Sequence, residues 1–147
     1  MGMDGYRRTG HAVYLVTYHI VFVTKYRKPC INRDVGEYLK KDLTAMIEGN
    51  KGHVHAAEYE KDHFHLLAEL PIDQPVAKFI GVLKGVSSRN VRREFAPYLS
   101  QFLWKDSFWS DSYFVSTTGG ASIDVVKEYV NSQRTERSNR GRPPKKK

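Results

Sequence analysis

Two histidines separated by a single residue could hold a metal ion. His63 and His65 lie in residues 62–70 (DHFHLLAEL), a run that is typical of a β-strand. Side chains alternate between the faces of a strand, so both histidines point to one face and Phe64 points to the other. Two neighbouring imidazoles on a rigid sheet would supply half of a metal site.

A tyrosine and a glutamine near the end of the chain could complete that site. Tyr129 and Gln133 are four residues apart in a segment, 123–133, that is predicted to be helical. Residues at this spacing share a helix face, which places the Tyr129 hydroxyl beside the Gln133 amide. A tyrosine nucleophile next to a third metal ligand, brought over a histidine pair, suits covalent attack on a phosphodiester.

A second histidine pair has the same spacing. His53 and His55 lie on the preceding predicted strand, which we expect at the edge of the sheet, where polar residues protect unpaired backbone groups. We therefore interpret this pair as solvated, and the alternative is that His55 supports the metal ligands. The acidic residues of this region are also interpreted as solvated rather than ligating: Glu58, Glu60, Asp62 and Glu69.

The rest of the sequence predicts the elements that position these groups. We expect strands over residues 13–24, 53–59 and 113–117, in addition to the histidine strand. Asn32 should open a helix that residues 50–52 end, and a second helix should lie between Pro75 and Pro97.

This order, β-α-β-β-α-β followed by a last helix, predicts the α+β class and a ferredoxin-like (split β-α-β) antiparallel sheet. The first and third strands should be central, and the two long helices should cover one face. The other face, which bears His63 and His65, should remain open for a substrate and for the C-terminal catalytic helix.

Composition and charge indicate a protein with one globular domain and a basic tail. The chain has 147 residues, of which 40% are hydrophobic, enough for one domain with a core. We expect a catalytic domain over residues 1–133 and a basic, disordered tail over residues 134–147. That tail holds seven Lys/Arg and one Glu, or +6 of the net charge of +8, so the body of the protein is near +2. The tail either keeps the protein soluble or contacts a polyanion nonspecifically.

Cysteine usage and hydropathy exclude other classes. Cys30 is the single cysteine, which excludes an internal disulfide and a cysteine zinc cluster. No stretch reaches the ~18 apolar residues of a membrane span. The first ten residues are polar and basic rather than a signal peptide, so we expect a cytoplasmic protein.

Two groups of cations are candidates for contact with DNA. Lys25, Tyr26 and Arg27 combine positive charge with an aromatic ring at the end of the first strand, which suits stacking with single strands. Lys84 and Arg89 belong to the basic side of the second long helix. They either form its solvent face or contact a DNA backbone.

The ordered set of motifs resembles the HUH single-tyrosine transposases, and most closely the TnpA type of small insertion sequences that move as single-stranded DNA. The resemblance covers nearly the whole chain. The matching blocks are residues 18–27 (YHIVFVTKYR), 62–70 (DHFHLLAEL), 78–85 (KFIGVLKG), 112–117 (SYFVST) and 128–129 (EY).

The resemblance implies a DNA strand transferase in which Tyr129 is the nucleophile and forms a 5′-phosphotyrosine bond. It implies that His63, His65 and Gln133 hold Mg²⁺ or Mn²⁺. It also implies single-stranded DNA with hairpin ends as the substrate and a homodimer in which the tyrosine helix of one subunit completes the histidine site of the other.

Two alternatives remain open at this point. A noncatalytic nucleic-acid-binding module can use the same ferredoxin-like sheet, but its stacking aromatics are replaced here by His63 and His65. A relaxase-like or replication-initiator-like HUH nuclease would share the chemistry, although such proteins usually carry further domains. A covalent protein–DNA adduct would distinguish the enzymes from the binding module.

Overall fold

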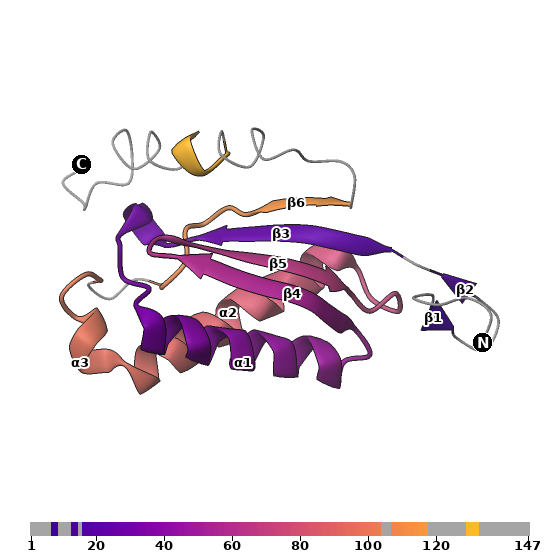
Figure 1. The fold of residues 1–147 in the computed structure, drawn as a ribbon, viewed down its shortest axis with the longest axis horizontal. Helices are drawn as coiled ribbons and strands as arrows, with labels where there is room; N and C mark the ends of the chain where they lie inside the picture. The colour runs from indigo at the N-terminus through magenta and orange to yellow at the C-terminus, as the bar shows by residue number, and fades with distance from the viewer. Residues whose placement is uncertain (1–6, 9–12, 15, 104–106, 118–128, 133–147) are drawn as a thin grey trace.

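A four-stranded antiparallel sheet with two long helices on one face forms the body of the molecule (Figure 1). The computed structural model describes residues 7–8, 13–14, 16–103, 107–117 and 129–132. The strand order is β4-β5-β3-β6, so the two central strands are those expected. The strands are β3 (Thr17–Val23), β4 (His53–Glu60), β5 (His63–Glu69) and β6 (Phe114–Thr117).

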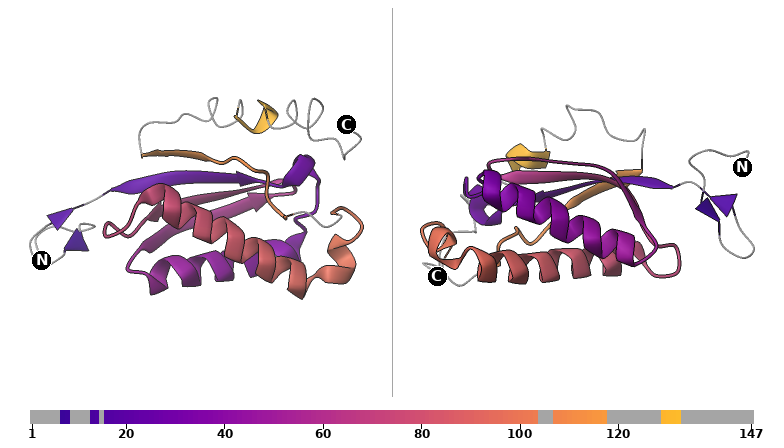
Figure 2. Two further views of the ribbon diagram at one scale, coloured as in Figure 1. Left: turned by 180° about the vertical axis from the view of Figure 1, so that it is seen from behind. Right: turned by 60° about the horizontal axis from the view of Figure 1, so that its bottom comes forward.

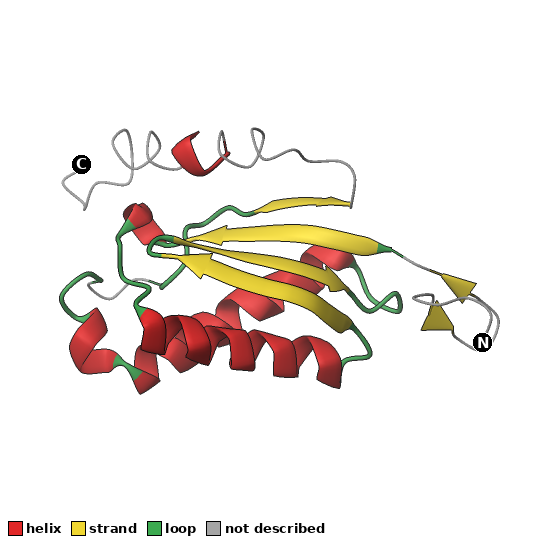
Figure 3. Ribbon diagram, viewed as in Figure 1, coloured by secondary structure: helices red, strands yellow, loops and turns green. Residues whose placement is uncertain are grey.

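The helices form the second layer, as Figures 2 and 3 show from other sides and by element type. They are α1 (Arg33–Gly49), α2 (Val76–Glu94) and the short α3 (Ala96–Leu99). α1 and α2 lie against the same face of the sheet, and the segment that contains Tyr129 lies over the opposite face (Figure 1). The predicted α+β class and its two-layer arrangement are confirmed.

The expected strand over residues 13–24 is wrong in its first part. Val13–Tyr14 form β2, which pairs with β1 (Arg7–Arg8) in a separate two-stranded sheet, and only Thr17–Val23 belong to the main sheet. The reason is the length of the neighbouring strand. Thr17 pairs with Glu69, the last residue of β5, so earlier residues have no partner strand in the main sheet.

The alternation along β5 and β3 builds the core. Phe64, Leu66 and Ala68 are at most 1% exposed and pack against the helices, as do Ile20 and Phe22 of β3. The intervening side chains point to the opposite face. Because side chains alternate between the two faces of a strand, His63 and His65 point away from the core.

Local signals explain where α1 begins and ends. The Asn32 side chain accepts a hydrogen bond of 2.8 Å from the Val35 backbone N–H, so the predicted N-cap is confirmed. At the other end Lys51, and not Gly52, adopts a positive φ, of 74°. Gly52 is required for a different reason, because a Cβ there would lie 2.5 Å from the Glu69 carbonyl oxygen.

Two serines, and not the neighbouring Val86, occupy core positions on α2. Ser87 and Ser88 are buried, whereas Val86 is partly exposed. The Ser87 hydroxyl accepts a hydrogen bond of 2.9 Å from the Trp109 indole, and the Ser88 hydroxyl accepts one of 2.8 Å from the Phe108 N–H. The serines thus attach residues 108–109 to α2, which an apolar side chain could not do.

Some predicted features lie outside the described residues. These are Gln133, most of the helix over 123–133 and the tail over 134–147. Within the part of the chain that is described, no helix is both long and apolar enough to cross a membrane.

Candidate active site

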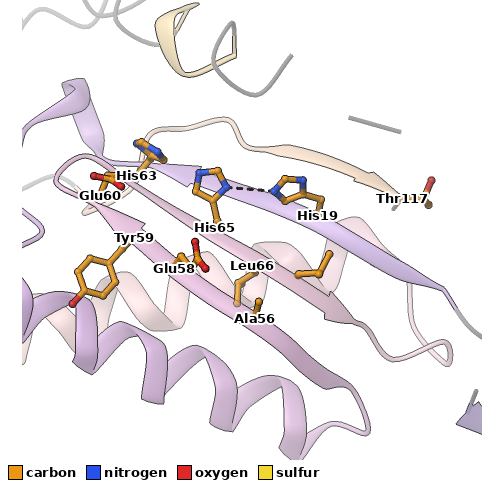
Figure 4. Close-up of a pocket in the computed structure, with 10 residues that line it drawn as sticks. His19, Ala56, Glu58, Tyr59, Glu60, His63, His65, Leu66 and Thr117 are labelled. Carbon is orange, nitrogen blue, oxygen red and sulfur yellow. Dashed lines mark hydrogen bonds between the residues drawn. The ribbon is translucent and has the colours of Figure 1, made fainter. Parts of the chain in front are cut away.

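His63 and His65 stand side by side on the face of β5 that the helices do not cover (Figure 4). Their ring centroids are 4.9 Å apart, and both residues are partly buried. The prediction that they share a face is confirmed. Glu60 and Glu58 on β4 are their direct cross-strand partners, opposite His63 and His65 respectively.

The histidines border a shallow depression of about 480 Å³ on this face. It extends from β4 across β5 and β3 to Thr117 of β6. The lining residues are His19, Ala56, Glu58, Tyr59, Glu60, His63, His65, Leu66, Leu67 and Thr117.

Asp62 orients His63. The Nδ1 atom of His63 lies 2.8 Å from Asp62 Oδ1, and Arg27 Nε donates to the other carboxylate oxygen at 2.6 Å. Burial tends to raise the pKa of Asp62, but hydrogen bonds from His63 and Arg27 outweigh it and lower the pKa to about 2. Asp62 is therefore ionised and half-buried, and the interpretation of it as a solvated acid is wrong.

His19 on β3 contacts His65. The two rings approach at 3.3 Å between His19 Nε2 and His65 Nδ1 (dashed in Figure 4). Burial, followed by the neighbouring His63 and His19, lowers the pKa of His65 to about 4. His65 is therefore a neutral imidazole at neutral pH, which is the form that binds metals.

The contact with Asp62 defines which nitrogen His63 can offer, and the tautomer of the His19–His65 contact decides this for His65. With Nδ1 of His63 donating to Asp62, its Nε2 carries the free lone pair. When His65 donates from Nδ1 to His19, its Nε2 is available in the same way. Among the described residues no group of three His, Cys, Asp or Glu side chains could hold a metal ion, so the pair needs a further ligand.

Tyr129 lies over the same open face. Its ring is 5.6 Å from the Phe114 ring, and its hydroxyl is 3.1 Å from Ser112 Oγ. The adjacent Val130 is 5% exposed and packs on Val21 and Val23 of β3. Those two valines are the cross-strand partners of His65 and His63, so the structure brings the tyrosine segment beside the histidine pair.

Arg27 links the tyrosine segment to the histidine support. Besides Asp62, its guanidinium contacts Asn131 Oδ1, at 3.4 Å from Nη1. Tyr26 and Arg27 both have left-handed backbone angles, with φ of 56° and 55°. Non-glycine residues are strained there by roughly 1–2 kcal/mol each, and such strain often accompanies functional positions.

The second histidine pair is not part of this arrangement. His53 and His55 lie on the edge strand, as expected, with 42% and 34% of their side chains exposed. His53 pairs with Glu48 at 3.1 Å, and His55 pairs with Glu69 at 2.6 Å. Glu69 is only 2% exposed, so the interpretation of it as a solvated acid is wrong.

The candidate DNA-binding residues differ in their surroundings. Lys25 pairs with Asp111 at 3.0 Å, Arg27 with Asp62, and the Lys84 ammonium group donates to backbone carbonyls of residues 110–112. Arg89 is exposed and borders a groove between α2 and residues 107–111. The DNA contacts of all five residues, Tyr26 included, stay predictions.

Sequence reasoning missed three residues of the site: His19, Asp62 and Ser112. The parity of the strands could have placed His19 on the histidine face. Asp62 had the signal of direct adjacency to His63. Ser112 had none, because its contact with Tyr129 depends on how a loop crosses the sheet edge.

Fold and site together define a class of α+β protein with paired histidines and a docked tyrosine on one open sheet face. Comparison with known proteins identifies the family. The profile of the family described as "Transposase IS200 like" matches residues 12–133. The chain therefore belongs to the IS200-like transposases, a family that transfers DNA strands.

Individual relatives agree with this assignment. The chain is 31% identical over 121 residues to the ISDra2 transposase TnpA of Deinococcus radiodurans. The match covers 82% of this chain and 86% of that protein. It is 30% identical over 135 residues to the transposase for insertion sequence element IS200 of Salmonella typhimurium, covering 89% and 85% respectively.

A solved structure supports the same conclusion at the level of the fold. A Deinococcus radiodurans R1 protein, described provisionally as a transposase, superimposes with a TM-score of 0.78 at 29% sequence identity. The match covers 86% of this chain and 97% of that one. The four-stranded sheet and its helices are thus shared over almost the entire length of the related protein.

Proposed function

We propose that the protein is a metal-dependent transposase that cuts and rejoins single-stranded DNA at hairpin-marked element ends through a 5′-phosphotyrosine intermediate. The observation that carries this proposal is the position of Tyr129. Val130 anchors its segment on the two valines that face the histidine pair across the sheet. A hydroxyl nucleophile and two metal-ligating groups therefore share one open surface.

Tyr129 attacks the phosphorus of the scissile phosphodiester. The bond between phosphorus and the 3′-oxygen breaks, and the proton lost by the phenol is balanced by the one gained by the 3′-hydroxyl. One phosphodiester is exchanged for another, so no nucleotide cofactor is needed. A 3′-hydroxyl then attacks the phosphotyrosine, restores a DNA phosphodiester and releases Tyr129.

His63 and His65 would hold a divalent ion, Mg²⁺ or Mn²⁺, through Nε2, with Gln133 as a third ligand. The donor set fits such an ion, since both Nδ1 atoms already have partners and His65 is neutral. A bound ion with open positions would polarise the phosphate and orient it for in-line attack. Glu58 and Glu60 are exposed on the neighbouring strand opposite the pair, and their carboxylates would add negative charge near a bound ion.

The proposal extends to the substrate and to the oligomeric state. Single-stranded DNA with hairpin ends suits a basic protein whose open sheet face is otherwise uncovered by helices. The proposed contacts are Tyr26 and the basic residues Lys25, Arg27 and Arg89. A homodimer would let the tyrosine segment of one subunit serve the histidine pair of the other.

The decisive experiment is incubation of the protein with single-stranded element ends and Mn²⁺, followed by denaturing electrophoresis. The expected product is a covalent protein–DNA adduct that depends on the metal. Tyr129→Phe removes only the hydroxyl, so it should abolish the adduct and leave DNA binding nearly unchanged. Binding without any adduct in the wild-type protein would favour the noncatalytic module, and an adduct in Tyr129→Phe would place the nucleophile elsewhere.

A further inference from the structure

The ammonium group of Lys84 binds one short loop, residues 110–112. Its Nζ atom donates to three consecutive backbone carbonyls, those of Ser110, Asp111 and Ser112, at 2.7, 3.0 and 3.3 Å. A lysine ammonium has three N–H donors, so this loop can use all of them. The side chain is partly buried, and its ammonium lies 5.6 Å from the centre of the Tyr113 ring.

The same loop contacts the proposed nucleophile. Ser112 Oγ lies 3.1 Å from the Tyr129 hydroxyl, and Asp111 is tied to Lys25 at 3.0 Å. The loop passes from the helix layer to β6. Helix α2, which contains Lys84, lies on one side of the sheet, whereas the segment that contains Tyr129 lies over the other side (Figure 1). A continuous set of contacts therefore runs from α2 around the sheet edge to the tyrosine hydroxyl.

We propose that Lys84 is a positioning residue for Tyr129. It fixes residues 110–112, and Ser112 in turn holds the hydroxyl at a defined place over the open face. The inference rests on the proposed role of Tyr129 as the nucleophile and adds a requirement to it. Rate should depend on a lysine that never touches DNA, because an oxygen displaced by about 1 Å loses its alignment with phosphorus.

A positioning role and a DNA-contact role for Lys84 predict different effects of its substitution on the salt dependence of DNA binding and on the cleavage rate. A lysine that neutralises a phosphate contributes about 0.7 to the slope of log affinity against log salt for single strands. A positioning lysine contributes nothing to that slope, and its loss lowers the cleavage rate at saturating DNA. The two roles are thus separated by one binding series and one single-turnover series.

The test compares Lys84→Met and Ser112→Ala with Lys41→Met, which removes a lysine from the exposed side of α1. Tyrosine labelled with ¹³C at the ζ carbon reports on the hydroxyl environment, and Tyr129→Phe assigns the resonance. Lys84→Arg, which retains charge and donors, serves as the rescue variant. Thermal unfolding followed by circular dichroism confirms that each variant is folded.

We expect Lys84→Met and Ser112→Ala to move the Tyr129 resonance and to lower the single-turnover rate about fivefold to tenfold, the equivalent of one hydrogen bond. Both should keep the wild-type salt slope, as should Lys41→Met. Lys84→Arg should recover part of the rate, and Ser112→Ala carries the test if Lys84→Met does not fold.

An unmoved resonance, an unchanged rate, or a salt slope reduced by about 0.7 in the Lys84 variant would each overturn the proposal. Failure of the proposed function would look different. An adduct that persists in Tyr129→Phe would remove the nucleophile assignment, while the resonance would still report whether Lys84 and Ser112 hold the hydroxyl.

Discussion

Asp62 and His63 are adjacent in the chain, and their side chains are joined by a contact of 2.8 Å between Oδ1 and Nδ1. Neighbouring residues on a regular strand would point to opposite faces. Asp62 can turn towards His63 because it belongs to the tight turn between β4 and β5. The turn therefore supplies the group that fixes the ring of the first proposed ligand.

The Asp62→Ala substitution should lower the affinity for Mn²⁺ by about 10-fold to 100-fold, the usual effect of removing a carboxylate that orients a ligating histidine. Titration calorimetry or electron paramagnetic resonance of free Mn²⁺ measures this without any DNA. Asp73→Ala, at an exposed position after β5, is the matched control. Equal affinity in the wild type and Asp62→Ala would refute the orienting role.

The two histidine pairs should respond differently to alanine. His63→Ala and His65→Ala should each abolish metal-dependent cleavage, whereas His53→Ala should leave it nearly unchanged, because His53 lies on the edge strand and pairs with Glu48. The measurement is the yield of covalent adduct in Mn²⁺. Loss of the adduct in His53→Ala alone would move the metal to the edge strand.

Acid should destabilise the fold in a window set by His65. Below its ordinary pKa of 6.5 the unfolded chain binds a proton at this position, whereas the folded chain does so only near a pKa of about 4. Above this pH window the free energy of unfolding does not depend on His65. As the pH falls through the window, proton binding by the unfolded chain lowers the free energy of unfolding. Urea unfolding at about pH 7 and about pH 5 measures the loss.

The His65→Gln variant should lose less unfolding free energy between those two conditions than the wild type does. His53→Gln serves as a comparison, since that side chain is 42% exposed. An equal loss in the wild type and His65→Gln would show that other groups dominate the acid response.

Two inactive proteins should restore activity when mixed, if the tyrosine segment serves a partner subunit. Tyr129→Phe lacks the hydroxyl, and a His63→Ala/His65→Ala protein lacks the ligands. A mixed dimer with exchanged segments contains one site with both wild-type elements, so adduct formation should return. The absence of recovery in preparations shown to contain mixed dimers would indicate that each chain uses its own tyrosine.

The thiol of Cys30 should be inert in the folded protein. It is fully buried, and burial raises its pKa to about 12. Because the thiolate is the reactive form, a disulfide reagent should modify Cys30 only as fast as the protein opens. Absorbance of the released thiol measures the rate in buffer and in urea, and fast labelling of the folded protein would contradict the burial.

The sequence could predict what depends on local periodicity. The shared face of His63 and His65 follows from alternation, and the start of α1 follows from Asn32, whose side chain caps the helix as expected. The central position of β5 follows from the order of elements alone.

What could not be predicted depends on register and on loops. The contact between His19 and His65 requires the pairing of β3 with β5, which places His19 opposite Leu67 and one step diagonal to His65. Lys84 has the spacing of a solvent-facing cation, and only the path of residues 110–112 gives its ammonium three carbonyls. Neither contact can be predicted from the residues that are adjacent to it in the sequence.

The strict alternation along β5 has a consequence for how such a protein can change over evolutionary time. Phe64 and Leu66 are buried in the core against the helices, whereas His63, His65 and Leu67 are partly exposed on the open face. A substitution at Leu67 or Thr117 can therefore alter what the surface accepts without disturbing the packing beneath it. A library that varies the outward positions of β5 and β6 would sample new targets on an intact scaffold.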